Sequence, residues 1–156
     1  MKTLAIVNLK GGVGKTVSAA NMAHILAVYH HKKVLLVDGD KQGNASRYFQ
    51  VYGEHDGTAA LLLADGLDAE AVERAIYRTG YYGLDIITSN LELYAADRAL
   101  YDRQDTDTAR VLSSVLDHVR NDYDFCIIDN GPSVDTVTLN VLAAADDVLI
   151  PIRPDE

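Results

Sequence analysis

Short apolar runs alternate along the chain with segments in which apolar residues recur every three or four positions. The runs at residues 4–7, 34–37, 84–88, 125–128 and 148–150 are too short for core helices, and most are rich in β-branched side chains. We therefore predict strands there. Because strands that are apolar throughout are buried on both faces, and helical segments join them here, the pattern predicts an α/β fold with a doubly wound, mostly parallel sheet and helices on both faces.

The clearest helical periodicity lies at residues 106–120. Its apolar residues form one stripe that we expect to face the core, namely Val111, Leu112, Val115, Leu116 and Val119. A first helix is expected to begin in a glycine-rich segment and to end near residues 30–33, where two histidines and two lysines suit the negative end of a helix dipole. Residues 58–64 and 69–76 are predicted to form shorter helices.

The length and composition are typical of one globular domain with a hydrophobic core. The 156 residues are 48% hydrophobic and contain no repeat, low-complexity tract or linker, so residues 1–156 are predicted to form a single domain. A net charge of −9 means that the surface as a whole repels nucleic-acid phosphates and anionic lipid, so any anion site must be local. Cys126 is the only cysteine and lies in an apolar run, where we expect a small buried side chain. With no signal peptide or membrane-length run visible, we expect a cytoplasmic chain that contacts no membrane.

A glycine-rich loop follows the first predicted strand. Residues 10–16 read Lys-Gly-Gly-Val-Gly-Lys-Thr and lead into a helical pattern, which is the order of a phosphate-binding P-loop. Glycines let backbone N–H groups turn towards phosphate oxygens, Lys15 supplies a charge at the β- and γ-phosphates, and Thr16 offers a hydroxyl to Mg²⁺. The predicted nucleotide-binding residues are Gly11, Gly12, Val13, Gly14, Lys15, Thr16 and Val17.

Three aspartates lie at or just after the ends of predicted strands. Asp38 and Asp40 follow the second run, and Asp129 ends the run at residues 125–128. Ligand sites in α/β proteins form at the carboxyl ends of the strands. An acidic residue at the position of Asp129 commonly holds Mg²⁺ through water in P-loop enzymes. A turn or capping aspartate is the alternative at each position.

These motifs together resemble the ParA/MinD family of deviant Walker A ATPases, and most of all its ParA-type partition ATPases. Leu9 stands where the ordinary P-loop motif has glycine, and three further blocks, at residues 34–46, 123–133 and 139–151, follow in the family's order. The resemblance covers nearly the whole chain. It implies ATP and Mg²⁺ as ligands, with Thr16, Asp38 and Asp129 around the metal.

The resemblance also implies a mechanism. The early lysine of the family, which matches Lys10, reaches across a nucleotide-sandwich dimer to the phosphates of the other subunit. The aspartate that matches Asp40 positions the attacking water, and Lys15 serves the phosphates of its own chain. A ParA-type function would be slow ATP hydrolysis that switches an ATP-dependent homodimer in plasmid or chromosome segregation, with a ParB-like partner. A solvated surface lysine is the alternative for Lys10.

Several positions depart from the family pattern. Lys41 replaces a usual proline, Gly39 separates the two aspartates, and Asn-Gly-Pro at residues 130–132 stands where Cys-Pro-Pro or a similar run is common. Losing the proline raises the entropy cost of ordering the loop. These changes bear on the rate of hydrolysis and on switching, and not on phosphate binding.

A function of another class stays open, namely a nucleotide-gated binding module that recruits a protein partner with weak or no hydrolysis. A membrane-positioning role of the MinD type is less supported because the chain lacks that family's C-terminal amphipathic helix, and a single cysteine disfavours an iron-sulfur relative. Family members continue well beyond the length of this chain. We therefore expect a truncated ATPase core, with non-specific DNA binding confined to a missing C-terminal part.

Overall fold

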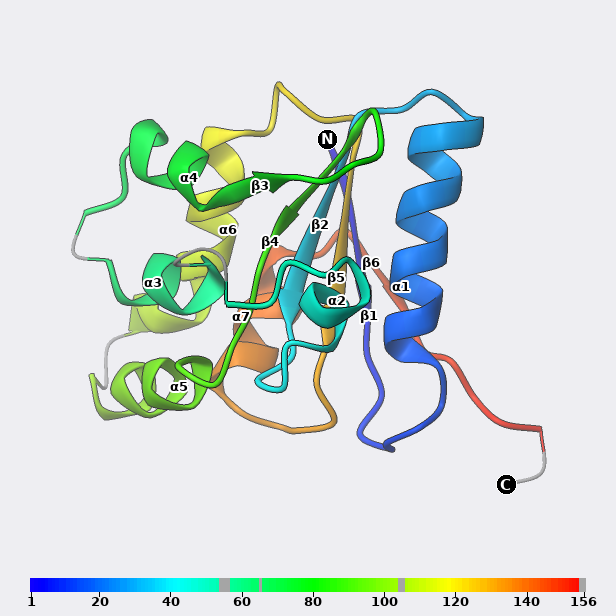
Figure 1. Ribbon diagram of the computed structural model, residues 1–156. Helices are drawn as coiled ribbons and strands as arrows, with labels where there is room; N and C mark the ends of the chain where they lie inside the picture. Colours follow the sequence, from blue (N-terminus) through cyan, green and yellow to red (C-terminus); the bar gives the residue numbers. More distant parts are fainter. Residues whose placement is uncertain (54–56, 65, 104–105, 155–156) are drawn as a thin grey trace.

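The computed structural model describes residues 1–53, 57–64, 66–103 and 106–154. Its centre is a six-stranded sheet in the order β3-β4-β2-β5-β1-β6 (Figure 1). Every neighbouring pair is parallel except β3 and β4. The strands are β1 Lys2–Ile6, β2 Val34–Gly39, β3 Ile76–Arg78, β4 Leu84–Ile87, β5 Phe125–Asn130 and β6 Asp147–Leu149. This arrangement confirms the doubly wound α/β fold.

Helices cover both faces of the sheet (Figure 1). One face carries α1 (Lys15–His24), its π-helical continuation Ile25–Tyr29 and the short α2 (Asn44–Tyr48). The other face carries α3 (Gly57–Leu63), α4 (Ala69–Ala75), α5 (Leu93–Asp102), α6 (Val111–His118) and α7 (Thr136–Ala144). Each described helix is too short or too polar to span a bilayer.

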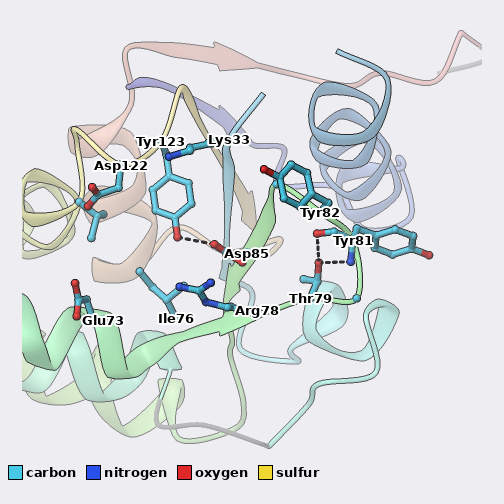
Figure 2. A pocket seen from close by; sticks show the side chains of 13 residues that line it. Lys33, Glu73, Ile76, Arg78, Thr79, Tyr81, Tyr82, Asp85, Asp122 and Tyr123 are labelled. Atoms are coloured by element: carbon cyan, nitrogen blue, oxygen red, sulfur yellow. Dashed lines mark hydrogen bonds between the residues drawn. The ribbon is translucent and has the colours of Figure 1, made fainter. Parts of the chain in front are cut away.

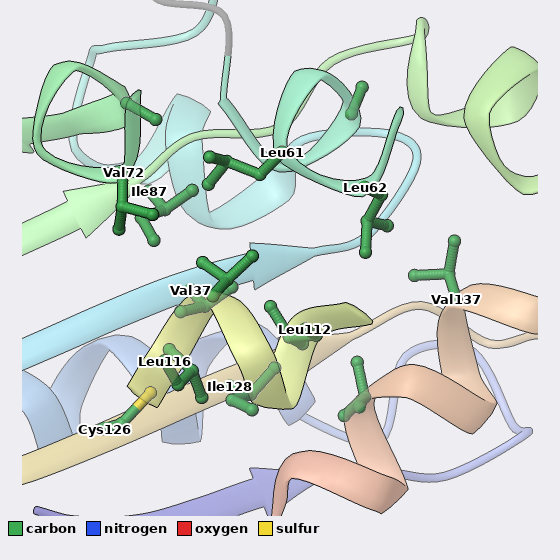
Figure 3. Packing of buried hydrophobic residues seen from close by; sticks show 14 of the residues in the cluster. Val37, Leu61, Leu62, Val72, Ile87, Leu112, Leu116, Cys126, Ile128 and Val137 are labelled. Carbon is green, nitrogen blue, oxygen red and sulfur yellow. The ribbon is translucent and has the colours of Figure 1, made fainter. Parts of the chain in front are cut away.

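The strands alternate their side chains between two hydrophobic clusters, because successive residues of a strand point to opposite faces. Leu36 and Ile127 lie in the cluster beneath α1, whereas Val37 and Ile128 lie in the cluster beneath the opposite helices. Figure 3 shows that second cluster, in which α6 contributes Leu112 and Leu116 and α3 contributes Leu61 and Leu62. Full burial of each such side chain contributes about 1.5–3 kcal/mol.

Most predicted elements are confirmed, with shifted ends. The first helix ends at Tyr29, close to the predicted basic cluster, and the stripe of the later helix is buried or packed against the core. Its first turn, Thr106–Arg110, is a 3₁₀ helix, and the α-helix occupies only Val111–His118 of the predicted range. Cys126 is buried, as expected.

The prediction of a helix at residues 69–76 was wrong at its end. The helix stops at Ala75, and Ile76 begins β3, which pairs antiparallel with β4. A strand as short as Ile76–Arg78 gives no readable alternation, and its place depends on the turn that brings it back against β4. The helices α2, α5 and α7 were also not predicted.

Candidate functional site

The carboxyl ends of the central strands meet the start of α1. Asp129 lies opposite Ile6 of β1 and opposite Asp38 of β2 in the parallel register. Since Asp38 and Asp129 each stand two residues after a side chain of the cluster beneath α1, they point to the same face as α1. The topology therefore brings the glycine-rich loop and both aspartates to one edge of the sheet, as predicted.

The loop between β1 and α1 has the backbone that phosphate binding needs. Gly12 and Gly14 have φ values of 73° and 90°, a left-handed conformation that glycine adopts without steric cost. Gly14 is also the N-cap of α1. A Cβ added at Gly11, Gly12 or Gly14 would meet no atom within 4 Å, so open space adjoins the loop. The N-terminus of α1 faces this space with the positive end of its dipole.

The two lysines of the loop differ in their surroundings. Lys15 is 8% exposed, and its Nζ donates a hydrogen bond of 3.0 Å to the backbone carbonyl of Lys10. Lys10 is exposed, and its backbone N–H donates to Asn8 Oδ1 at 2.8 Å. The structure thus holds the Lys15 ammonium against the loop and leaves the Lys10 residue at the surface.

Asp129 has unusual surroundings for a carboxylate. Both of its oxygens are buried, and within the described residues neither has a hydrogen-bond partner of full geometry, although the Thr16 hydroxyl lies close enough to favour the charged form. Burial raises the pKa of Asp129 to about 7 against the opposing influence of the Thr16 hydroxyl, and the charges of Asp38 and Asp40 add to the rise. An oxygen pair without partners, beside a threonine hydroxyl, suits a hard cation.

Asp38 accepts hydrogen bonds at both of its oxygens from other groups of the protein. Its Oδ2 accepts hydrogen bonds of 2.7 Å from both the backbone N–H and the hydroxyl of Ser46, and its Oδ1 accepts from the Asp40 N–H at 3.1 Å. Burial nevertheless outweighs these bonds and raises its pKa to about 6. Asp38 fastens the segment at residues 39–46 to the end of β2, and its role in a magnesium shell stays a prediction.

Asp40 is held within the turn that follows β2. It is 5% exposed, its Oδ1 accepts from the Gln42 N–H at 3.0 Å, and its Oδ2 accepts from the Asn44 side chain. A Cβ added at Gly131 would lie 3.2 Å from Asp40 Oδ1. The loop after β5 therefore passes directly against this carboxylate.

The departures at residues 39 and 130 have structural explanations. A Cβ at Gly39 would lie 3.0 Å from the backbone oxygen of Asp129, so glycine permits close packing of β2 and β5. Asn130 is buried, and its Nδ2 donates to the Gly131 carbonyl at 3.0 Å and to Thr138 Oγ1 at 3.1 Å. These bonds tie the loop after β5 to α7.

Sequence reasoning missed the partners of Lys41. Its Nζ lies 2.7 Å from Asp97 Oδ2 on α5 and 2.7 Å from Asp135 Oδ2 at the N-cap of α7. Burial disfavours the charge of Lys41, but hydrogen bonds to Asp135 and Asp97 outweigh this effect and raise its pKa. Because α5 was not predicted, no signal in the sequence pointed to Asp97.

The edge has the composition of a site that takes magnesium together with a phosphate ligand. Within the described residues, no three His, Cys, Asp or Glu side chains are grouped to hold a metal on their own. Mg²⁺ is usually bound through one or two carboxylates plus substrate phosphates and water. Asp129 and Thr16, next to the glycine loop, fit that kind of site.

A second candidate cavity lies at the opposite end of the sheet. A cavity of about 880 Å³ adjoins the amino ends of β2, β4 and β5 and is lined by charges of both signs (Figure 2). Inside it, the Tyr123 hydroxyl donates to Asp85 Oδ2 at 2.8 Å. Ligands of α/β proteins bind at the carboxyl ends of strands, so we assign the functional site to the glycine-loop edge.

Similarity to known proteins extends over nearly the whole chain. A family model described as an AAA domain matches residues 1–156. The chromosome-partitioning ATPase Soj of Treponema pallidum is 40% identical over 153 residues, which are 97% of this chain and 57% of that protein. The chain belongs to the ParA/MinD family of ATPases. The sporulation initiation inhibitor protein Soj of Bacillus subtilis is 37% identical, and the match covers 97% of this chain and 58% of that protein.

A solved structure shares the fold. The crystal structure of cobyrinic acid a,c-diamide synthase from Mycobacterium smegmatis, with bound ATP analog and magnesium, superposes with a TM-score of 0.87. It is 32% identical, and the match covers 97% of this chain and 60% of that one. The ParA/MinD chain described here thus spans somewhat more than half the length of the relatives that it matches.

Proposed function

We propose that this chain is the nucleotide-binding core of a ParA-type partition ATPase that binds ATP with magnesium and hydrolyses it slowly. The observation that carries the proposal is the buried carboxylate of Asp129, which has no hydrogen-bond partner among the described residues and lies at the edge that holds the glycine loop. A protein that leaves a buried carboxylate unsatisfied loses stability. A cation bound there would remove that cost.

In this proposal the loop binds the triphosphate. The backbone N–H groups around Gly12 and Gly14 would donate to phosphate oxygens, and the ammonium of Lys15, now on the Lys10 carbonyl at 3.0 Å, would turn to the β- and γ-phosphates. Thr16 and Asp129 would hold the metal. Bound magnesium neutralises charge that develops on the transferred phosphoryl group.

Asp40 is the residue proposed to position the attacking water. Its Oδ1 faces the loop after β5, and the Gln42 N–H fixes the orientation of the carboxylate. Because phosphoryl transfer depends mainly on positioning and charge stabilisation, an aspartate held in a loop gives slow turnover unless a partner tightens the loop. This is the behaviour of a timed switch.

The proposal is tested by steady-state phosphate release from the full gene product with Mg-ATP. Asp40→Ala should lower kcat by roughly a hundredfold while the Kd for ATP stays nearly constant, because the contact is made to water and not to the bound nucleotide. Asp117→Ala, which removes an exposed aspartate of α6, is the matched control. Parental turnover in Asp40→Ala would contradict the assignment.

Dimerisation and partners form the second part of the proposal. Lys10 is exposed at the rim of the site, where its ammonium could reach phosphates held by a second subunit. Lys10→Ala should leave ATP binding largely intact and weaken ATP-dependent dimerisation, measured by sedimentation. An unchanged dimer fraction would count against this role. We also propose that a ParB-like partner stimulates hydrolysis, and that any contact with DNA is made by residues outside 1–156.

A nucleotide-gated binding module is the second candidate function. It is favoured by the hydrogen bonds that both oxygens of Asp40 already accept from their own turn, at Gln42 and Asn44. A carboxylate held in this way would leave water poorly oriented. Tight ATP binding with no phosphate release, with or without a ParB-like protein, would decide for this candidate.

A further inference from the structure

Lys41 joins three segments that are distant in the sequence. Its ammonium lies 2.7 Å from both Asp97 and Asp135, and the three side chains are 13%, 19% and 13% exposed. Exposed ion pairs contribute little to stability. A lysine shared by two mostly buried carboxylates is different, since removing one charge leaves the others uncompensated.

The two carboxylates also organise the start of α7. Asp135 Oδ1 accepts the Thr138 N–H at 2.8 Å, and Asp97 Oδ1 accepts the Val137 N–H at 3.2 Å. Each carboxylate therefore uses one oxygen for α7 and the other for Lys41, and Asp135 Oδ2 also accepts a hydrogen bond from the Ser133 hydroxyl. Through them the turn after β2 is connected both to α5 and to the loop that follows β5.

A second set of contacts fixes the same turn. The Lys41 ammonium lies 5.2 Å from the centre of the Tyr94 ring, and Gln42 Nε2 donates to the Tyr94 hydroxyl at 3.0 Å. Both neighbours of Lys41 in the chain thus have defined surroundings, because Asp40 lies against Gly131. Gln42 contacts α5, Asp40 lies against the loop after β5, and Lys41 between them contacts both.

We propose that Lys41 is a positioning residue, whose ammonium, clamped between Asp97 and Asp135, holds the segment that carries Asp40 in register with the loop that follows Asp129. The catalytic part of this inference rests on the proposed role of Asp40 in hydrolysis. Where a proline would fix the turn through its backbone, here an ion-pair clamp supplies the order. The clamp makes the two loops at the site move together.

The clamp itself is tested without any turnover, by amide hydrogen exchange in the nucleotide-free protein. Lys41→Met keeps the length of the side chain and removes its charge. Exchange should become roughly tenfold faster both at residues 41–47 and at residues 133–138. Lys32→Met, at an exposed lysine, is the matched control. Unchanged exchange in Lys41→Met, or a change at one segment alone, would overturn the coupling.

Catalytic positioning is tested by separating kcat from ATP affinity in the full gene product. Lys41→Met should lower kcat by roughly ten- to a hundredfold, because small displacements of a positioning group are costly, while the Kd for ATP changes by less than about twofold. Lys41→Arg, which keeps the charge, should recover much of the rate. A purely structural role would instead move Kd and kcat together, or neither.

A double-mutant cycle guards against a variant that fails to fold. Asp97→Asn keeps an oxygen that can accept the Val137 N–H and removes only the charge that faces Lys41. It should therefore lower kcat, as Lys41→Met does. Combined with Lys41→Met it should add little further loss, since the two residues act as one unit. Additive effects would overturn the clamp. If the parental protein releases no phosphate, the proposed hydrolysis fails by itself, and the exchange comparison alone decides on the clamp.

Discussion

The two ends of the sheet hold aspartates in different surroundings, with Asp85 half-buried at one end and Asp129 buried at the other. At the amino end, Asp85 accepts a hydrogen bond from the Tyr123 hydroxyl inside the cavity of about 880 Å³, and burial together with this bond raises the pKa of Tyr123 well above its usual range, so the hydroxyl keeps its proton. At the carboxyl end, Asp129 is buried with both oxygens unpartnered among the described residues. The amino end has a cavity and a satisfied tyrosine–aspartate pair, whereas the carboxyl end has a buried carboxylate without a described partner of full geometry.

This difference identifies a site better than cavity size does. A hydrogen-bonded tyrosine–aspartate pair contributes to stability and gains little from a ligand. An orphaned carboxylate costs stability, and a fold keeps such a group where binding repays the cost. The glycine loop, whose backbone donors also adjoin open space, belongs to the same end of the sheet.

The largest expected effect tests the claim that the carboxyl end alone binds nucleotide. Lys15→Ala removes the charge that would face the β- and γ-phosphates and should weaken Mg-ATP binding by roughly a hundredfold or more. Titration calorimetry measures it. Lys33→Ala, at the rim of the amino-end hollow, is the control and should bind ATP like the parent. Unchanged affinity in Lys15→Ala would sink the assignment.

The next effect is a dependence of stability on pH without nucleotide or metal. The folded-state pKa values of Asp129 and Asp38 are raised from 3.8 to about 7 and about 6. The folded protein therefore binds more protons than the unfolded chain between these values and 3.8. The contribution of this pair to the free energy of unfolding is fully present below about pH 4. It falls as pH rises, by at most about 1.4 kcal/mol per pH unit for each group, and levels off above about pH 7.

Thermal unfolding between pH 4 and pH 8 checks this prediction. The relevant quantity is the difference between the parent and Asp129→Asn, since that subtraction removes the titration of groups elsewhere. The difference should grow between pH 4 and pH 7 and then stay constant. A difference that is flat across this range would show that Asp129 is not held in an unfavourable charged state.

A smaller effect separates the two aspartates directly. At pH 8, Asp129→Asn replaces a buried carboxylate by a neutral amide and should raise Tm above the parental value in the absence of magnesium, by about 2–4 °C for each kcal/mol recovered. Asp85→Asn, at the satisfied pair, should give no such rise. The contrast would vanish if Asp129 were paired in solution, and both variants would then unfold at or below the parental Tm.

Much of the fold was predictable because the signals were local. Each apolar run that became a central strand is buried on both faces, and the stripe from Val111 to Val119 is visible from its spacing. The missed elements have weaker signals. The strand β3 exists through its pairing with β4, and α2 is a single short turn whose place depends on Ser46 bonding to Asp38.

The features of the site also divide into those that local sequence predicts and those that it does not. The backbone of the glycine loop and the start of α1 were predictable because neighbouring positions encode both, while nucleotide binding by these residues stays a prediction. Position at the ends of strands also predicted that Asp38 and Asp129 would meet. Sequence could not say that Asp38 is satisfied by Ser46 while Asp129 has no described partner, or that Lys41 meets Asp97 and Asp135, since these facts depend on how loops fold back.

The smallest expected effect concerns the amino end itself. Tyr123→Phe removes the hydroxyl that donates to Asp85 Oδ2 at 2.8 Å and leaves the ring in place. The loss of one such bond to a partly buried carboxylate should lower the free energy of unfolding by about 0.5–1.5 kcal/mol, or Tm by about 2–4 °C for each kcal/mol. Because this pair lies at the opposite end of the sheet from the glycine loop, the Kd for Mg-ATP should stay at the parental value, measured by the calorimetry used for Lys15→Ala. A Tyr123→Phe protein with normal stability and weakened ATP binding would reverse the roles given to the two ends, because the hollow and not the orphaned carboxylate would then mark the ligand site.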